Sequence, residues 1–222
     1  KFDKYLIENF KKKNISHKIF KGNTLNELEE VKKGDGTPFK VFTPYWRAAE
    51  KFYIEKIPSK EKIVKKCAKK KSYFKKTIKF EKILPKKNWF NKFEKFWTPN
   101  EENALKELKF FLKERVEDYS EARNFPNVIG TSKLSPYIKH GQIHVQTIMD
   151  ECYKIKKKGI SKFLAEIGWR EFNHSLINHF PHMLKGNYSK KFDNFPWQKN
   201  LKYLSAWKKG LTGYPIVDAG MR

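Results

Sequence analysis

The chain has 222 residues, enough for one large domain or two small ones. The 49 Lys and Arg against 24 Asp and Glu make the chain strongly basic, and the 16% aromatic residues argue against a disordered chain and indicate a folded protein. A net charge of +25 is typical of a protein that binds a polyanion, and nucleic acid is the first candidate. A lysine-biased genome would give the same excess of positive charge.

Cysteines are scarce, and no segment of the sequence is long and apolar enough for a membrane. Cys67 and Cys152 lie far apart without a CxxC pair, which predicts free thiols in a reducing compartment and hence a cytoplasmic protein. No run approaches the ~20 apolar residues of a membrane span, so no membrane partner is expected. Both ends look cut, because the chain lacks an initial Met and stops at Arg222 without a helix stop signal.

The first fifty residues predict a small α/β segment. Apolar residues recur at helical spacing from Lys1 to Phe10, and residues 17–20 suggest a short strand. Residues 24–31 predict a second helix, with Thr24 as the N-cap and Glu27 completing a capping box. This helix should end in the glycine turn that follows it.

Two segments without clear periodicity come next. Residues 36–47 carry prolines and predict an extended, kinked segment. Residues 51–95 contain seventeen lysines and four glutamates, a net charge of 17 − 4 = +13, with prolines at 58 and 85. Such a lysine run predicts a solvated linker.

Helical patterns dominate from residue 98 onward. Thr98 and Glu101 form a capping box with Pro99 at the first helical position. The apolar positions that follow at helical spacing are Ala104, Leu105, Leu108, Phe111, Leu112 and Val116. Two further helices are predicted around residues 143–149 and 163–177, and no alternating strand pattern is found. The second half therefore reads as all-α, and the fold class is mixed overall.

The segment Gly-Thr-Ser-Lys-Leu-Ser-Pro-Tyr at residues 130–137 combines hydroxyls with a cation. The hydroxyls of Thr131, Ser132 and Ser135, with free N–H groups after a glycine, could cradle a phosphate. Taken alone, the same residues also fit an ordinary helix N-cap and turn.

The predicted helix around residues 163–177 places four polar or aromatic side chains on one face. Glu166, Trp169, Arg170 and Asn173 stand at i, i+3, i+4 and i+7. Glu166 and Arg170 could simply form a surface ion pair, and Trp169 could simply be core.

Four motifs, in order along the chain, resemble the DNA photolyase and cryptochrome family, and class I cyclobutane pyrimidine dimer photolyases in particular. They are GTPFKVFTPYWR at 36–47, GTSKLSPY with the upstream Tyr119 and Arg123, WREF at 169–172, and TGYPIVDAGMR at 212–222. The resemblance is strong from residue 119 onward. It implies the end of an α/β antenna domain at 1–50, a linker at 51–97, and the first part of an all-α FAD-binding domain at 98–222.

The resemblance also implies roles for individual residues. FAD would be held by Tyr119, Thr131, Ser132, Leu134 and Ser135. Glu166 would be catalytic through a hydrogen bond to the damaged pyrimidine, and Trp169 would pack on its ring. Arg123 and Arg170 are further candidates for contacting DNA, and Trp207 matches the solvent-side electron-transfer tryptophan of the family. One departure is Lys133, where the family has Arg, and Lys lacks the planar fork for bidentate contacts.

The implied activity is light-driven repair of cyclobutane pyrimidine dimers by electron transfer from reduced FAD. Damaged DNA would be the partner of a monomer, with a folate- or deazaflavin-type antenna chromophore in the complete protein. Two alternatives stay open: a cryptochrome-type photoreceptor without repair activity, and a non-enzymatic basic nucleic-acid-binding domain. Five histidines between residues 140 and 182 match no common zinc pattern, so no metal is expected.

Overall fold

A computed structural model describes residues 2–17, 22–55 and 89–222. The chain divides into two compact units, Lys1–His179 and Phe180–Arg222, and each is described by itself. Every regular element within the described ranges is helical, and none of them contains a strand. The short strand expected at residues 17–20 lies mostly outside the described residues.

After α1 (Phe2–Lys12), the N-terminal segment follows a course that the sequence did not predict. Residues 24–31 form bends and turns, so the helix predicted there is wrong. The Leu25 N–H donates to the Glu171 carboxylate at 2.6 Å, and the Asn26 side chain donates to the Ala49 carbonyl at 3.1 Å. These long-range hydrogen bonds replace the local ones that a helix would use.

Helix α2 (Phe42–Glu55) overturns the expectation of an extended segment for residues 42–47, whereas residues 36–41 are not helical. Pro44 lies in the first turn of this helix, where its missing N–H removes no intrahelical bond. The helix also runs across the expected start of the linker at residue 51. The 3-10 helix η2 (Trp89–Lys95) lies near the other end of the lysine-rich stretch, whose residues 56–88 are outside the described part.

Helix α3 (Glu101–Glu114) begins later than predicted. Its N-cap is Asn100, whose side chain accepts the Asn103 N–H at 2.8 Å, so the predicted cap at Thr98 is wrong. The remaining helices of the first unit are α4 (Tyr119–Ala122), α5 (Ser135–Lys139), α6 (Val145–Tyr153) and α7 (Ile160–His179). Helices α6 and α7 confirm the two later helix predictions.

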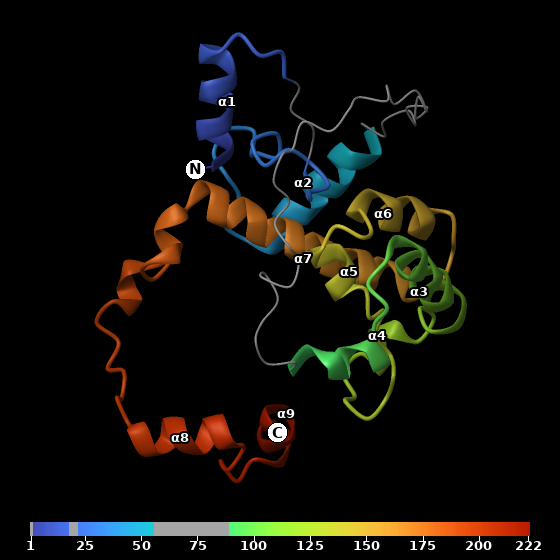
Figure 1. Cartoon of the computed structure of the whole chain (residues 1–222), viewed down its shortest axis with the longest axis vertical. Coiled ribbons are helices and arrows are strands. Elements are labelled where there is room, and N and C mark those ends of the chain that lie inside the picture. The colour runs from blue at the N-terminus through green and yellow to red at the C-terminus, as the bar shows by residue number, and fades with distance from the viewer. Residues whose placement is uncertain (1, 18–21, 56–88) are drawn as a thin grey trace, which may run out of the picture. The chain divides into compact units, whose positions relative to one another are not determined.

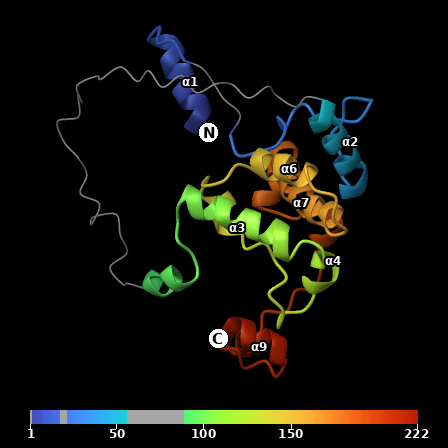
Figure 2. The same ribbon diagram turned by 90° about the vertical axis from the view of Figure 1, so that its right-hand side faces the viewer.

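Helix α7 is the centre of the first unit. Helices α2, α4 and α6 pack against it, and Figures 1 and 2 both show α6 beside it. At the contact with α2, a Cβ added to Gly168 would lie 2.5 Å from Cδ2 of Trp46, so only glycine permits this approach. Buried residues of the N-terminal segment and of α3 to α7 belong to one hydrophobic cluster. The core therefore joins segments that the lysine-rich stretch separates in sequence.

The second unit contains η3 (Pro181–Leu184), η4 (Lys190–Phe192), α8 (Leu201–Lys209) and α9 (Pro215–Met221). Gly210 ends α8 in the left-handed region at φ +63°. The Asp218 carboxylate accepts hydrogen bonds from the Thr212 N–H, the Thr212 hydroxyl and the Gly213 N–H at 2.7, 2.6 and 3.0 Å. Across the described residues, no helix has the length and apolar character needed to cross a membrane.

Candidate functional site

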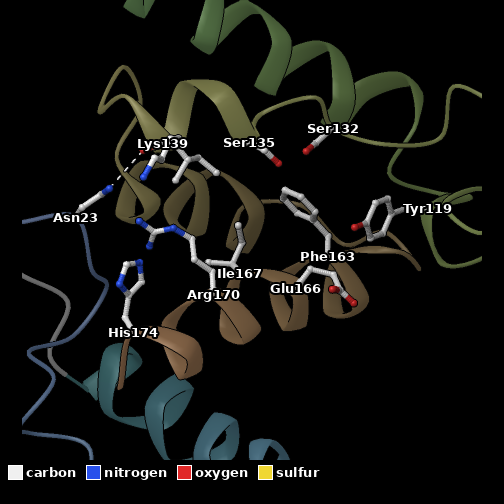
Figure 3. A pocket seen from close by; sticks show the side chains of 11 residues that line it. Asn23, Tyr119, Ser132, Ser135, Lys139, Phe163, Glu166, Ile167, Arg170 and His174 are labelled. Carbon is white, nitrogen blue, oxygen red and sulfur yellow. Dashed lines mark hydrogen bonds between the residues drawn. The ribbon is translucent and has the colours of Figure 1, made fainter. Parts of the chain in front are cut away.

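A cavity of about 390 Å³ lies against one face of α7 (Figure 3). Its walls come from α7, from Tyr119 at the start of α4, from α5 with the segment that leads into it, and from the N-terminal segment. The residues that line it are Asn23, Tyr119, Ser132, Ser135, Ile138, Lys139, Phe163, Glu166, Ile167, Arg170 and His174. It therefore collects side chains from four separate stretches of sequence.

The segment before α5 is held close to α4 by a glycine. A Cβ added to Gly130 would lie 2.6 Å from the backbone carbonyl carbon of Ala122. Ser132 and Ser135, two of the residues implied as flavin contacts, line the cavity. The side chain of Leu134 is buried in the core, and Thr131 is exposed, so neither lines it.

Tyr119 is fixed by two aromatic neighbours. Its ring lies edge-on to Phe111 at 5.5 Å and to Phe163 at 5.4 Å between centroids. Burial raises the pKa of its hydroxyl, so the group stays a neutral phenol that can donate a hydrogen bond. A ligand in the cavity would meet this rigid, neutral donor.

Glu166 is paired with Arg123, which lies outside α7, and with Lys162, which stands one turn earlier on α7. It forms an ion pair with Arg123, and the Lys162 ammonium lies 3.4 Å from its carboxylate. The Arg123 guanidinium lies 5.5 Å from the centre of the Tyr119 ring, and its pKa is raised mainly by the hydrogen bond to Glu166. The simple Glu166–Arg170 surface pair is therefore not the arrangement found.

Arg170 instead pairs with its neighbour Glu171, at 2.7 Å between Nη1 and Oε1. Glu171 is only 1% exposed and also accepts the Leu25 N–H. Burial raises the pKa of this carboxyl, while the hydrogen bond from Leu25 and the charge of Arg170 oppose the rise. A buried carboxylate therefore holds Arg170 at the wall of the cavity.

Three polar lining residues, Asn23, Lys139 and His174, were not among the predicted site residues. Lys139 and His174 join Arg170 at one end of the cavity, where Figure 3 shows the three side chains near one another with Asn23. Burial and the charges of Arg170 and Lys139 lower the pKa of His174. His174 stands four residues after Arg170 and could have been found from the helix face, whereas nothing in the sequence marks Asn23.

The other residues predicted on α7 line a second, shallower cavity of about 360 Å³. Glu166, Trp169, Arg170 and Asn173 all border it, which confirms that they share one face. Trp169 is 43% exposed and hence not a core residue. One face of its ring is stacked on Phe42, at 3.8 Å between centroids and 8° between planes.

The remaining predicted residues belong to other parts of the chain or lie outside the described residues. Trp207 is on α8 in the second unit and is 49% exposed. Cys152 is a buried free thiol whose pKa burial raises to about 12, and Cys67 lies outside the described residues. Among the residues described, no three His, Cys, Asp or Glu side chains gather as metal ligands.

The polar groups of the first cavity suit a ligand with an anionic part. Hydroxyls of Ser132 and Ser135 and the cations Lys139 and Arg170 are typical partners of phosphate oxygens. The second cavity offers an exposed aromatic face beside a carboxylate, which suits a planar base. Glu166 and Arg170 border both cavities, so the two ligands would meet at this part of α7.

Comparison with known proteins gives matches along the whole chain. Residues 163–222 match a family model described as the FAD binding domain of DNA photolyase, and residues 1–62 match one described as DNA photolyase. The deoxyribodipyrimidine photo-lyase of Agrobacterium fabrum is 35% identical over 99% of this chain and 47% of its own length. That of Alkalihalophilus pseudofirmus is 34% identical over 95% of this chain and 44% of its own.

A solved bacterial class III photolyase from Agrobacterium tumefaciens aligns with 100% of this chain and 47% of its own, with a TM-score of 0.85 and 34% identity. The chain thus spans about half the length of the curated relatives it matches. Because a class III protein is among these relatives, the comparisons do not single out the narrower class I resemblance.

Proposed function

Since this chain belongs to the DNA photolyase and cryptochrome family, we propose that the complete protein repairs cyclobutane pyrimidine dimers in DNA with light and FAD. The observation that supports this most is the pair of cavities on α7, with Glu166 and Arg170 bordering both. Repair by electron transfer needs a cofactor and a damaged base close together, and this face of α7 offers adjoining places for the two.

The residues of the first cavity fit FAD as a ligand. Ser132, Ser135, Lys139 and Arg170 would hold the diphosphate, because charge-assisted and hydroxyl hydrogen bonds suit its oxygens. Tyr119 would contribute a neutral donor and an aromatic edge. Thr131 and Leu134 would contribute only through backbone groups, because their side chains do not line the cavity. Bound reduced FAD would supply an electron to the dimer after absorbing blue or near-ultraviolet light.

The residues of the second cavity would bind the substrate. The exposed part of Trp169 would stack on an extruded base, a contact that is worth roughly 1–3 kcal/mol. In its ionised form the Glu166 carboxylate can only accept, so it would accept an N–H of the pyrimidine. Arg123, already paired with Glu166, would keep this carboxylate in place and could contact a nearby DNA phosphate.

Repair is tested directly by irradiating the complete protein with blue light in the presence of an oligonucleotide that carries thymine dimers. The proposal expects loss of dimers in the light, none in the dark, and a bound-flavin absorption spectrum near 450 nm. A flavin spectrum without dimer loss would instead support the photoreceptor alternative. Absence of flavin would support a basic nucleic-acid-binding domain and overturn the assignment of the first cavity.

A further inference from the structure

The stack of Phe42 on Trp169 is a contact that the proposed roles of α7 do not use. The two rings are almost parallel, with 8° between planes and 3.8 Å between centroids. Phe172 lies edge-on to both, at 6.1 Å from Phe42 and 6.0 Å from Trp169. The three rings therefore form a small aromatic cluster around the one tryptophan that borders the second cavity.

The stack of Phe42 on Trp169 is fixed by α2, a helix of the N-terminal segment. Phe42 is the first residue of α2, and α2 is anchored on α7 by Trp46, which packs against Gly168. Aromatic pairs usually prefer an offset or edge-to-face geometry, so a nearly face-to-face pair indicates that the surrounding packing sets the position of the Phe42 ring. The anchor lies only one residue from Trp169 on α7. The Phe42 ring therefore has a fixed position against the indole of Trp169.

Because Trp169 is exposed, its indole needs a fixed neighbour to keep one rotamer. The indole is 43% exposed on a helix surface, where a side chain without a neighbour would sample several rotamers. Phe42 covers one face of the indole, and Trp169 still borders the second cavity together with Glu166 and Asn173. A ring that is ordered before binding loses less side-chain entropy when a base stacks on it.

We propose that Phe42 is a positioning residue that orients the indole of Trp169 for stacking on a flat ligand, taken under the proposed function to be the extruded pyrimidine. It acts only through Trp169 and does not border the cavity. A segment that matches the family model at residues 1–62 would thus set the geometry of the substrate face built on α7.

The orientation itself is tested in the complete protein labelled with 5-fluorotryptophan. The Trp169 signal is assigned as the one lost in Trp169→Phe. Phe42→Ala should shift and broaden this signal, because the ring current of Phe42 is removed and the indole gains freedom. Phe42→Tyr, which keeps the stacked ring, should leave it nearly unchanged. Phe110→Ala, which removes an exposed phenylalanine of α3, is the matched control. An unchanged Trp169 signal in Phe42→Ala would overturn the proposal.

The consequence for binding is tested with an ultraviolet-irradiated oligonucleotide at fixed salt. Phe42→Ala should weaken binding of damaged DNA by about two- to tenfold, as expected for ordering one side chain, while binding of intact DNA and flavin content stay unchanged. Phe42→Tyr should restore the affinity and also covers the case in which the alanine variant fails to fold. In a Trp169→Ala background, Phe42→Ala should have no further effect. An equal loss in both backgrounds would overturn the proposal.

Only the binding measurement presupposes the proposed function. If the unchanged protein does not distinguish damaged from intact DNA, the assignment of the substrate is wrong. The fluorine signal of Trp169 would still decide whether Phe42 orients the indole, so the two failures can be told apart.

Discussion

Gly168 should not tolerate alanine, although it lies in the middle of helix α7. A Cβ at this position would lie 2.5 Å from Cδ2 and 2.9 Å from Cζ3 of Trp46. Carbon atoms pack at about 3.5–4.0 Å, so the indole or the whole of α2 must move by about 1 Å. Trp46 is only 8% exposed and cannot swing into solvent. The structure therefore predicts that Gly168→Ala strains the contact between α2 and α7.

The size of the effect follows from two opposing terms. Overpacking a core costs about 1–3 kcal/mol, and replacing glycine by alanine inside a helix returns about 1 kcal/mol. We expect a net loss of up to about 2 kcal/mol, or up to about 4–8 °C in Tm for a chain of this size. Thermal unfolding followed by circular dichroism of matched variants measures this.

Two controls separate the contact from helix propensity. Gly220→Ala in α9 has no atom within 4 Å of the new Cβ, so it should be neutral or stabilising. In a Trp46→Leu background, the smaller side chain leaves room, and Gly168→Ala should cost less than in the parent. A rise in Tm for Gly168→Ala, with no dependence on residue 46, would refute the reasoning.

Four further predictions concern the site and the second unit. Trp169→Ala should weaken the discrimination of damaged from intact DNA, by about 1–3 kcal/mol, with flavin content near normal; equal binding of damaged DNA by mutant and parent would remove Trp169 from the substrate site. Glu166→Ala should lower the repair yield per absorbed photon more than it lowers binding, by about 2–4 kcal/mol, with Glu166→Gln milder; an unchanged yield would contradict the role. Gly130→Ala should push the segment before α5 away from α4 and lower flavin retention after gel filtration, since its Cβ would lie 2.6 Å from Ala122; full retention would show that the segment adapts. Hydrogen bonds from Thr212 and Gly213 lower the pKa of Asp218, so the stability that its carboxylate contributes is present above the ordinary pKa of about 4 and is lost as pH falls below that value. The Thr212 amide signal in nuclear magnetic resonance spectra should therefore move only at such acid pH, and in Asp218→Asn it should already be displaced at neutral pH.

The strongly periodic helices were predictable from sequence, because their apolar residues repeat over several turns. This holds for α6 and α7, and the shared face of Glu166, Trp169 and Asn173 followed from the same periodicity. The face pattern also suggested a pair between Glu166 and Arg170. It could not show that Arg123, which is 43 residues earlier, would take the carboxylate instead.

The N-terminal segment was predicted poorly, for a physical reason. Residues 24–31 carry a good local helix signal, but the Leu25 N–H reaches a carboxylate 146 residues away. Burying a carboxylate such as that of Glu171 without hydrogen-bond donors is costly in free energy, and this cost outweighs the small stabilisation that a capping box gives to a helix. Likewise, the prolines at 38 and 44 suggested an extended chain, whereas the second of them lies in the first turn of a helix that packs on α7.

Helix α7 shows why sequence distance is a poor guide to the construction of this site. Within six residues it presents Glu166 and Arg170 to the cavities, while Gly168, Trp169 and Glu171 contact Trp46, Phe42 and Leu25 of the N-terminal segment. Each contact to that segment stands next to a residue that borders a cavity. Glu171, held by Leu25, in turn holds Arg170. A change at residues 25–46 therefore reaches the cavities through single neighbouring side chains, and the site should be regarded as the product of both segments.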